Sequence, residues 1–283
     1  MRTQFARLDG SHPDPDPVPN KHVVHLDWFR TEFDLAYGFS KDWDVELDVP
    51  YDVKRVRARY ELPDGTRFDN PEGDLHHRDE TLRGLSDFKL LANYRPGSVL
   101  MKDDRLHVGI GLSLPVGETE EDPWKLGDQG QKHQHIQFGT GTVDPVLRLD
   151  YYRLADPIGF LVSANLQIPL YENHHTYKGS TQADFTIGPR VQATDWLVFG
   201  ASYVASYQTR SFWDGDPDQN SGYFLQGVGF NAAIRVAPGV TIIPTVLHVF
   251  SIDTRGSSDS LKMDWLMGLS LDLALGGGEA PEQ

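Results

Sequence analysis

The stretch RTEFDLAYGFSKDWDVELDVPYD, residues 30–52, decides the fold, because apolar and polar residues alternate along both of its arms. A short polar turn at residues 40–42 separates the arms. The apolar positions of the arms are Phe33, Leu35, Tyr37, Phe39, Val45, Leu47, Val49 and Tyr51. Successive strand side chains point to opposite faces, so each arm has one apolar face and one polar, largely acidic face. The stretch therefore predicts an antiparallel β-hairpin.

The same alternation recurs to the C-terminus. Further segments with a period of two are residues 88–95, 106–117, 143–152, 158–170, 185–192, 197–206, 224–236, 240–250 and 261–273. With the two arms and a weaker segment at residues 1–8, they predict about twelve strands in one all-β domain over residues 1–275. Residues 1–21 are expected to be a weakly structured N-terminal segment with a Pro-rich loop, and residues 276–283 a disordered tail.

Short turns and long polar loops alternate between these segments. The long loops are residues 63–83, 118–138, 172–180, 211–221 and 253–260. In an up-and-down meander this order places the tight turns at one end and the long loops at the other, as in bacterial outer-membrane barrels. After Lys54 the apolar residues move from odd to even positions, at Val56, Ala58 and Tyr60. This shift predicts a β-bulge or the end of the buried zone.

The composition permits a membrane barrel. Hydrophobic residues make up 39% of the 283 residues, mean hydropathy is -0.43, and no apolar run approaches the ~18 to 20 residues of a membrane helix. A transmembrane barrel needs only alternating segments of about 10 residues, so it is compatible with these values. The first residues, MRTQFARLDG, contain no apolar core of a signal peptide, so we expect the targeting segment to be missing or already removed.

Net charge makes some classes of partner unlikely, and the absence of cysteine excludes some kinds of site. The formal net charge of -15 argues against nucleic acid and against an anionic headgroup surface as partners. Because the chain contains no Cys, disulfides, thiolate metal sites and Cys nucleophiles are excluded.

The polar face of the strands carries charges of both signs, which favours a wet lumen over a soluble exterior. The predicted lumen-lining residues are Arg30, Glu32, Asp34, Glu46, Asp48, Lys89, Arg95, Arg148, Asp150, Asp184, Arg190, Arg235, Lys262 and Asp264. Aromatic residues cluster near both ends of the strands, as interfacial girdles do in lipid. The alternative is a large soluble β-sandwich with a charged exterior, although sandwich loops do not usually sort by length so regularly.

The order and spacing of several segments resemble those of a known family. These segments are FDLAYGFSKDWDVELDVPY at residues 33–51, GLSDFKLLANYR at 84–95, LHVGIGLSLPVGE at 106–118 and FGTGTVDPVLRLDYYR at 138–153. Over roughly residues 22–275 the chain resembles the MetA-pathway phenol-degradation family of proposed outer-membrane transporters. The resemblance implies a bacterial outer-membrane β-barrel connected with uptake of hydrophobic or aromatic compounds.

Two loop clusters contain residue types that bind metals. His133 and His135 could chelate through imidazoles on one strand face. Asp214, Asp216 and Asp218 alternate as in a calcium loop, but the loop lacks the Gly and the closing Glu of that motif. Solvated loop histidines and an Asp/Pro/Gly turn are the competing interpretations, and we predict no metal and no cofactor.

The sequence contains no G-x-S-x-G and no glycine-rich phosphate loop, so we predict no catalytic residues. We expect a monomeric outer-membrane barrel that passes or guards a small solute, with outer-membrane lipid around it. Arg95, Arg148, Arg190 and Arg235 are expected to face the acidic first hairpin. The alternatives are a plugged structural or ligand-binding barrel and a hydrolase with its catalytic residues at the outer rim.

Overall fold

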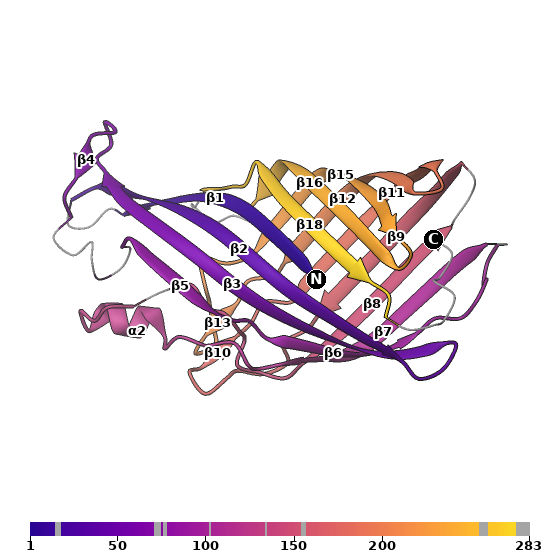
Figure 1. Cartoon of the computed structure of the whole chain (residues 1–283). Helices are drawn as coiled ribbons and strands as arrows, with labels where there is room; N and C mark the ends of the chain where they lie inside the picture. The colour runs from indigo at the N-terminus through magenta and orange to yellow at the C-terminus, as the bar shows by residue number, and fades with distance from the viewer. Residues whose placement is uncertain are drawn as a thin grey trace.

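The computed structural model describes residues 1–14, 18–70, 75, 78–101, 103–133, 135–153, 157–254 and 260–275. In these residues one antiparallel sheet closes on itself, because β1 pairs both with β2 and with β17 and β18 at the other end of the chain (Figure 1). The predicted disordered tail, residues 276–283, lies outside the described residues.

The wall is an up-and-down meander. Its strands are β1 (Arg2–Asp14), β2 (Asn20–Gly38), β3 (Trp43–Glu61), β5 (Glu80–Leu85), β6 (Phe88–Tyr94), β7 (Asp104–Leu114), β8 (Asp144–Arg153), β9 (Ile158–Gln167), β11 (Gln182–Thr194), β12 (Leu197–Gln208), β15 (Tyr223–Ala237), β16 (Val240–Asp253), β17 (Ser260–Lys262) and β18 (Trp265–Leu273). β5 and β6 pair in succession with β3, and β17 and β18 pair in succession with β1, so each couple fills one position. The described wall therefore has twelve positions, which confirms the predicted fold class.

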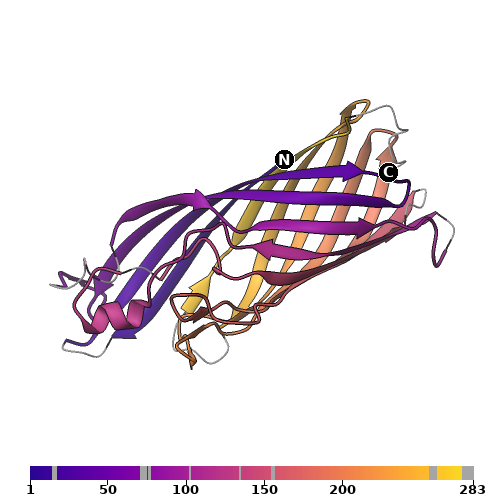
Figure 2. The ribbon, with the colours of Figure 1, turned by 90° about the horizontal axis from the view of Figure 1, so that it is seen from below.

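The two ends of the barrel differ in their connections. At one end, here called the turn end, strands are joined through residues 39–42, 95–103, 154–157, 195–196 and 238–239. At the other, the loop end, they are joined through residues 15–19, 62–79, 115–143, 168–181 and 209–222. There β16 is followed by residues 254–259, β17, residues 263–264 and β18. The short elements of the loop end are β4 (Arg67–Phe68), α2 (Pro123–Asp128), β10 (Tyr177–Lys178), β13 (Phe212–Trp213) and β14 (Asp216–Pro217). Figure 2 shows α2 at this end.

Large apolar side chains cover the outside of the barrel, and polar ones fill the inside. Leu112 and Leu269, from two of the predicted apolar rows, are 44% and 49% exposed. The buried residues include Asp44, Asp48, Asp52, Asn93, Asp104, Ser113 and Asp144. This distribution is the reverse of a water-soluble core and is that of a transmembrane β-barrel, so the soluble sandwich does not apply. None of the helices in the described residues is long and apolar enough to cross a membrane.

Three local expectations differ from the structure. Residues 2–14 form a full strand despite the weak pattern, because their backbone pairs with β2 along the whole length. β5 begins within the predicted loop 63–83 and pairs with residues 51–56 of β3. The predicted bulge after Lys54 is wrong, because the β2–β3 register runs unbroken from Lys21 opposite Glu61 to Gly38 opposite Asp44. The apolar residues change parity after Lys54 because, toward the loop end, β3 has apolar residues on its inward face and charged residues on its outward face.

Candidate functional site in the barrel lumen

The inward face of β3 carries a row of carboxylates. Asp44, Glu46, Asp48 and Asp52 occupy alternate or near-alternate positions, and the three Asp residues are buried. A buried carboxylate is costly unless it is paired or hydrogen-bonded. The partners of this row therefore determine how the lumen is filled.

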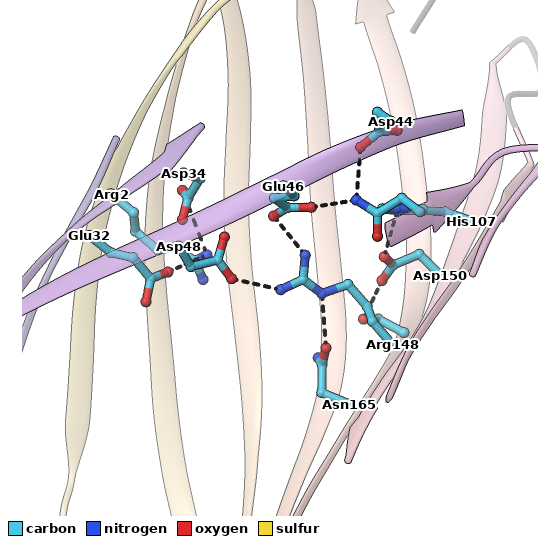
Figure 3. A network of polar contacts seen from close by, with 12 residues as sticks. Arg2, Glu32, Asp34, Asp44, Glu46, Asp48, His107, Arg148, Asp150 and Asn165 are labelled. Atoms are coloured by element: carbon cyan, nitrogen blue, oxygen red, sulfur yellow. Dashed lines mark hydrogen bonds and ion pairs between the residues drawn. The ribbon is translucent and has the colours of Figure 1, made fainter. Parts of the chain in front are cut away.

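Arg148 on β8 neutralises the middle of the row. Its Nη1 lies 2.7 Å from Glu46 Oε1, its Nη2 lies 3.1 Å from Asp48 Oδ2, and its Nε donates to Asn165 (Figure 3). The side chain passes over β7, where Gly109 faces it. A Cβ on Gly109 would lie only 2.6 Å from Asn93 Oδ1 and 3.2 Å from Arg148 Cβ. The missing side chain of Gly109 therefore makes room for this bridge.

A second cluster surrounds Asp52 on β3, near the break between its partner strands β5 and β6. Arg30 donates to both carboxylate oxygens of Asp52, at 2.8 and 2.7 Å, and Trp28 Nε1 donates at 2.9 Å. Ser86, in the break between the two strands, donates to Asp52 Oδ2 at 2.5 Å. This bidentate arginine pair, with two further donors, satisfies the buried carboxylate.

The connection between β7 and β8 folds into the lumen at residues 137–140. Asp87 Oδ1 accepts from the backbone N–H of Gly117 at 2.9 Å, and its Oδ2 accepts from the N–H of Thr140 at 2.7 Å. Lys54 Nζ donates to the carbonyl of Gln137 at 2.5 Å and lies 4.5 Å from the centre of the Phe138 ring. Side chains of the wall thus hold this loop segment inside the bore.

Two adjoining chambers lie beneath the loops. The polar chamber, of about 270 Å³, is lined among others by Arg30, Glu32, Asp48, Lys89, Gln167 and Gln182. The apolar chamber, of about 320 Å³, lies nearer the loop end and is lined among others by Leu8, Val24, Leu26, Val56, Ile136 and Leu261. His135 and Gln208 line both chambers. The residues after Lys54 that broke the predicted alternation therefore contribute to an internal apolar surface.

Opposite the carboxylate row, the inner wall carries small and apolar residues, with polar ones such as Ser202, Ser206 and Thr245 among them. Asp184 and Ser206 form a hydrogen bond on the lumen side, so Ser206 points inward. Residues opposite each other in the sheet point to the same side, so the strand register then identifies the inward residues of β15, β16 and β18. The inward residues of β12, β15, β16 and β18 include Val204, Leu225, Gly227, Gly229, Leu247, Val249 and Leu266. They continue from the apolar chamber toward the middle of the barrel. We call this surface the apolar strip.

The other predicted lumen residues differ in their surroundings. Arg95 pairs with Asp44 at 2.8 Å, and Arg190 donates to Asn231 at 2.9 Å. Asp150 accepts from Ser163 at 2.6 Å, and Asp184 accepts from Ser206 at 2.7 Å. Glu32 and Asp34 lie 2.9 and 4.0 Å from Arg2, and Lys89 lines the polar chamber. Arg95 and Arg148 thus face the acidic hairpin, whereas Arg190 bonds to β15 and Arg235, opposite Thr241, is exposed near the turn end.

Two of the predicted residues lie outside this set. Lys262 is opposite Asp9 of β1 in the sheet. Asp9 points outward, because it follows the outward residues Phe5 and Arg7 at steps of two, so Lys262 points outward as well. Asp264 is exposed at the break between β17 and β18. The alternation in residues 261–273 does not continue through this break, and this is why the sequence pattern assigned both side chains to the lumen.

The predicted metal-binding residues do not converge. The rings of His133 and His135 are 5.3 Å apart and nearly perpendicular, and His135 stacks edge-on against Trp124. Asp214 pairs with Lys125 at 2.8 Å, Asp216 is exposed, and Asp218 accepts from Ser211 in its own loop. Among the described residues, no group of three or more His, Cys, Asp or Glu side chains is placed to hold a metal ion.

Sequence reasoning missed several residues of the site. Asn93 donates to Asp44 and Glu46, and Thr140 and Ser86 bond to Asp87 and Asp52. Asn93 was detectable, since it shares the inward parity of Lys89 on β6. Thr140 was not, because a loop that folds back into a barrel has no periodic signal.

Comparisons with known proteins show the fold. No family model matches the chain, and no curated protein matches it in sequence, so the MetA-pathway resemblance stays a prediction. The crystal structure of the COG4313 outer membrane channel from Pseudomonas putida F1 matches with a TM-score of 0.59 and 10% identity, over 96% of this chain and 94% of that chain. A FadL homologue from Pseudomonas aeruginosa matches with a TM-score of 0.46 and 10% identity, over 97% and 89% of the two chains, too weakly to support an argument. The chain therefore has the fold of an outer-membrane channel.

Proposed function

We propose that the protein is a channel of the bacterial outer membrane that admits small solutes, hydrophobic or aromatic ones included, from the loop end. The observation that carries the proposal is the pair of adjoining chambers, one apolar and one polar, inside a closed barrel. A solute would meet the apolar chamber first and the polar chamber next.

The division of the lumen supports a mainly apolar solute with a polar group. The apolar strip offers a continuous surface from Leu8 and Leu26 to Leu247, while the ionic network of Arg148 lies on the other side. An apolar surface removes the hydrophobic part of a solute from water, and nearby charges can orient its polar group. Phenol-like solutes have this character.

The second candidate is a barrel that is closed in its resting state. Residues 137–140 lie in the polar chamber and are held by Asp87 and Lys54. A plug bound by a few hydrogen bonds can either fill the bore permanently or move to open it. We propose that residues 137–140 move to open the bore. We also propose that the protein acts as a monomer without a catalytic role.

Conductance and flux test the proposal together. Purified protein in a planar bilayer is expected to give discrete conductance steps, and liposomes that contain it should take up a monoaromatic alcohol faster than a sugar of similar size. Liposomes reconstituted with heat-denatured protein provide the control. The channel proposal is wrong if native protein leaves the bilayer silent and the uptake of both solutes equal to that of the control.

A further inference from the structure

Five arginines gather on the outside of the barrel wall, at the loop end of β1, β3 and β5. They are Arg7, Arg55, Arg57, Arg59 and Arg83, here called the arginine surface. The strand register places them close together: Asp27 is opposite both Arg7 and Arg55, and Val53 is opposite Arg83. Four of the five are therefore on two neighbouring strands, and the fifth is two strands away across β2.

These arginines point away from the lumen. Along β3, Arg55, Arg57 and Arg59 follow Tyr51 and Val53 at steps of two, and Tyr51 belongs to the exposed apolar exterior. The inward positions on either side of Arg55 hold Lys54 and Val56, whose side chains contact or line the interior. Since strand side chains alternate strictly, the arginine surface shares a face with the lipid-facing residues.

Among the described residues, the five arginines share this outer surface with three carboxylates, those of Asp9, Asp27 and Glu61, so positive charge is in excess. Asp27 accepts from Arg7 at 2.6 Å and from Arg57 at 3.0 Å, so one carboxylate holds two guanidinium groups. Arg59 pairs with Glu61 at 2.9 Å. Within the part of the chain that the structure describes, Arg55 and Arg83 make no ion pair, and both are exposed.

The arginine surface borders directly on the lipid-facing zone. Arg83 shares a row with Phe29, which is 49% exposed, and the row of Arg55 lies two residues farther along the strands. Two residues of a strand span about 7 Å. β2 and β3 have 19 residues each, against the about 9 to 11 that cross a bilayer core, and Figure 1 shows both continuing past the barrel wall at the loop end. The arginines are therefore at the level of lipid headgroups.

We propose that the arginine surface binds the phosphate groups of a phosphorylated lipid that packs against this side of the barrel. Arginine forms bidentate, charge-assisted hydrogen bonds with phosphate, and basic clusters beside a membrane-spanning segment attract anionic headgroups. The net charge of -15 argued against such a partner, but that sum does not reveal local clusters. The inference rests on the membrane location in the proposed function and is independent of solute passage.

Binding to two forms of one glycolipid tests the inference. Native mass spectrometry in detergent would measure the affinity of the protein for bisphosphorylated lipid A and for the same lipid with its phosphates removed. The double variant Arg55→Gln/Arg83→Gln should bind the phosphorylated form about thirtyfold more weakly, as expected for two cations at an anionic surface. It should bind the dephosphorylated form as the unchanged protein does.

A matched variant controls for net charge. Lys41→Gln/Arg235→Gln also removes two positive charges, from exposed side chains at the turn end, away from the arginine surface. It should keep full affinity. The inference is overturned if both double variants lose equal affinity, or if the unchanged protein binds the two lipid forms equally.

Conductance separates this inference from the proposed function. Arg55→Gln/Arg83→Gln should conduct as the unchanged protein does, because both side chains lie outside the lumen. If the unchanged protein were silent in a bilayer but still preferred the phosphorylated lipid, the channel proposal would fail and the lipid site would remain. If the unchanged protein conducted but bound both lipid forms equally, the lipid site would fail and the channel proposal would remain.

Discussion

Arg148 on β8 and Glu46 on β3 form an ion pair with 2.7 Å between Nη1 and Oε1, although β6 and β7 lie between their strands in the wall. The pair therefore crosses the inner surface of two strands instead of joining neighbours. Asn93 on β6 donates a hydrogen bond to Glu46. Gly109 on β7 has no side chain and leaves room beneath the arginine. Small and polar residues on the intervening strands are what allow the bridge.

The variant Arg148→Met should lower stability and change ion selectivity. It leaves Glu46 and Asp48 without their cation, and breaking a largely buried pair costs about 3 kcal/mol or more. The two carboxylates should then make the lumen favour cations, seen as a shift of the reversal potential in a salt gradient. Urea unfolding in detergent measures the stability.

Arg95→Met is the matched control for this change. Arg95 also pairs with a carboxylate of β3, Asp44, but its side chain is 49% exposed, and exposed pairs contribute about 1 kcal/mol or less. An equal loss of stability in the two variants would contradict the role given to Arg148.

The variant Asp87→Ala should release the loop that lies in the lumen. Asp87 accepts three hydrogen bonds, one from Gly117 and two from Thr140, and these hold residues 137–140 in the bore. We expect a severalfold higher single-channel conductance, or more frequent openings. Asp184→Ala removes a lumen carboxylate that, among the described residues, is hydrogen-bonded by Ser206 and does not contact residues 137–140, so it should leave conductance nearly unchanged.

A second variant tests the same loop without touching a charge. A Cβ added at Gly139 would collide with Asp87 Oδ1 and with Gly117 Cα. Gly139→Ala should therefore displace the loop and raise conductance as Asp87→Ala does. If both variants conduct like the unchanged protein, residues 137–140 do not close the channel.

The alternation of apolar residues was enough to predict the barrel. Each predicted segment needed only a period of two, and the sorting of connections by length fixed the up-and-down order. β1 is the weakest case, since its residues have little apolar character, and its strand depends on backbone pairing with β2 and β18. Pairing of this kind is set by closure of the sheet, which no local window of sequence contains.

The contents of the lumen could be predicted only in part. Inward parity identified Arg148, Glu46 and Asp48 as lumen residues, but not that they meet, because their contact depends on curvature across four strands. The apolar strip was missed because Leu247 and Val249 occupy positions that alternation assigned to the polar face. One feature was visible but misread: the shift at Val56 marked an apolar chamber rather than a bulge.

A cation on the lipid-facing side should destabilise the barrel in proportion to its depth. Ile110 on β7 is 62% exposed on the apolar exterior. Ile110→Arg should cost about 2 to 4 kcal/mol, as cations do near the middle of a bilayer, whereas Thr81→Arg, beside Arg55, should cost about 1 kcal/mol or less. Unfolding of both variants in liposomes measures the difference. Equal stabilities would contradict the outward orientation of the apolar face.

The apolar chamber should determine the affinity for aromatic solutes. Leu26 is opposite Val56 in the β2–β3 register, and both line the chamber. Leu26→Asn introduces an amide that a monoaromatic alcohol cannot satisfy, so we expect about tenfold weaker binding by calorimetry, in line with the effect of small changes in apolar pockets. Glu32→Gln alters only the polar chamber and should leave this affinity unchanged. Equal affinities for the unchanged protein and Leu26→Asn would place the aromatic group elsewhere.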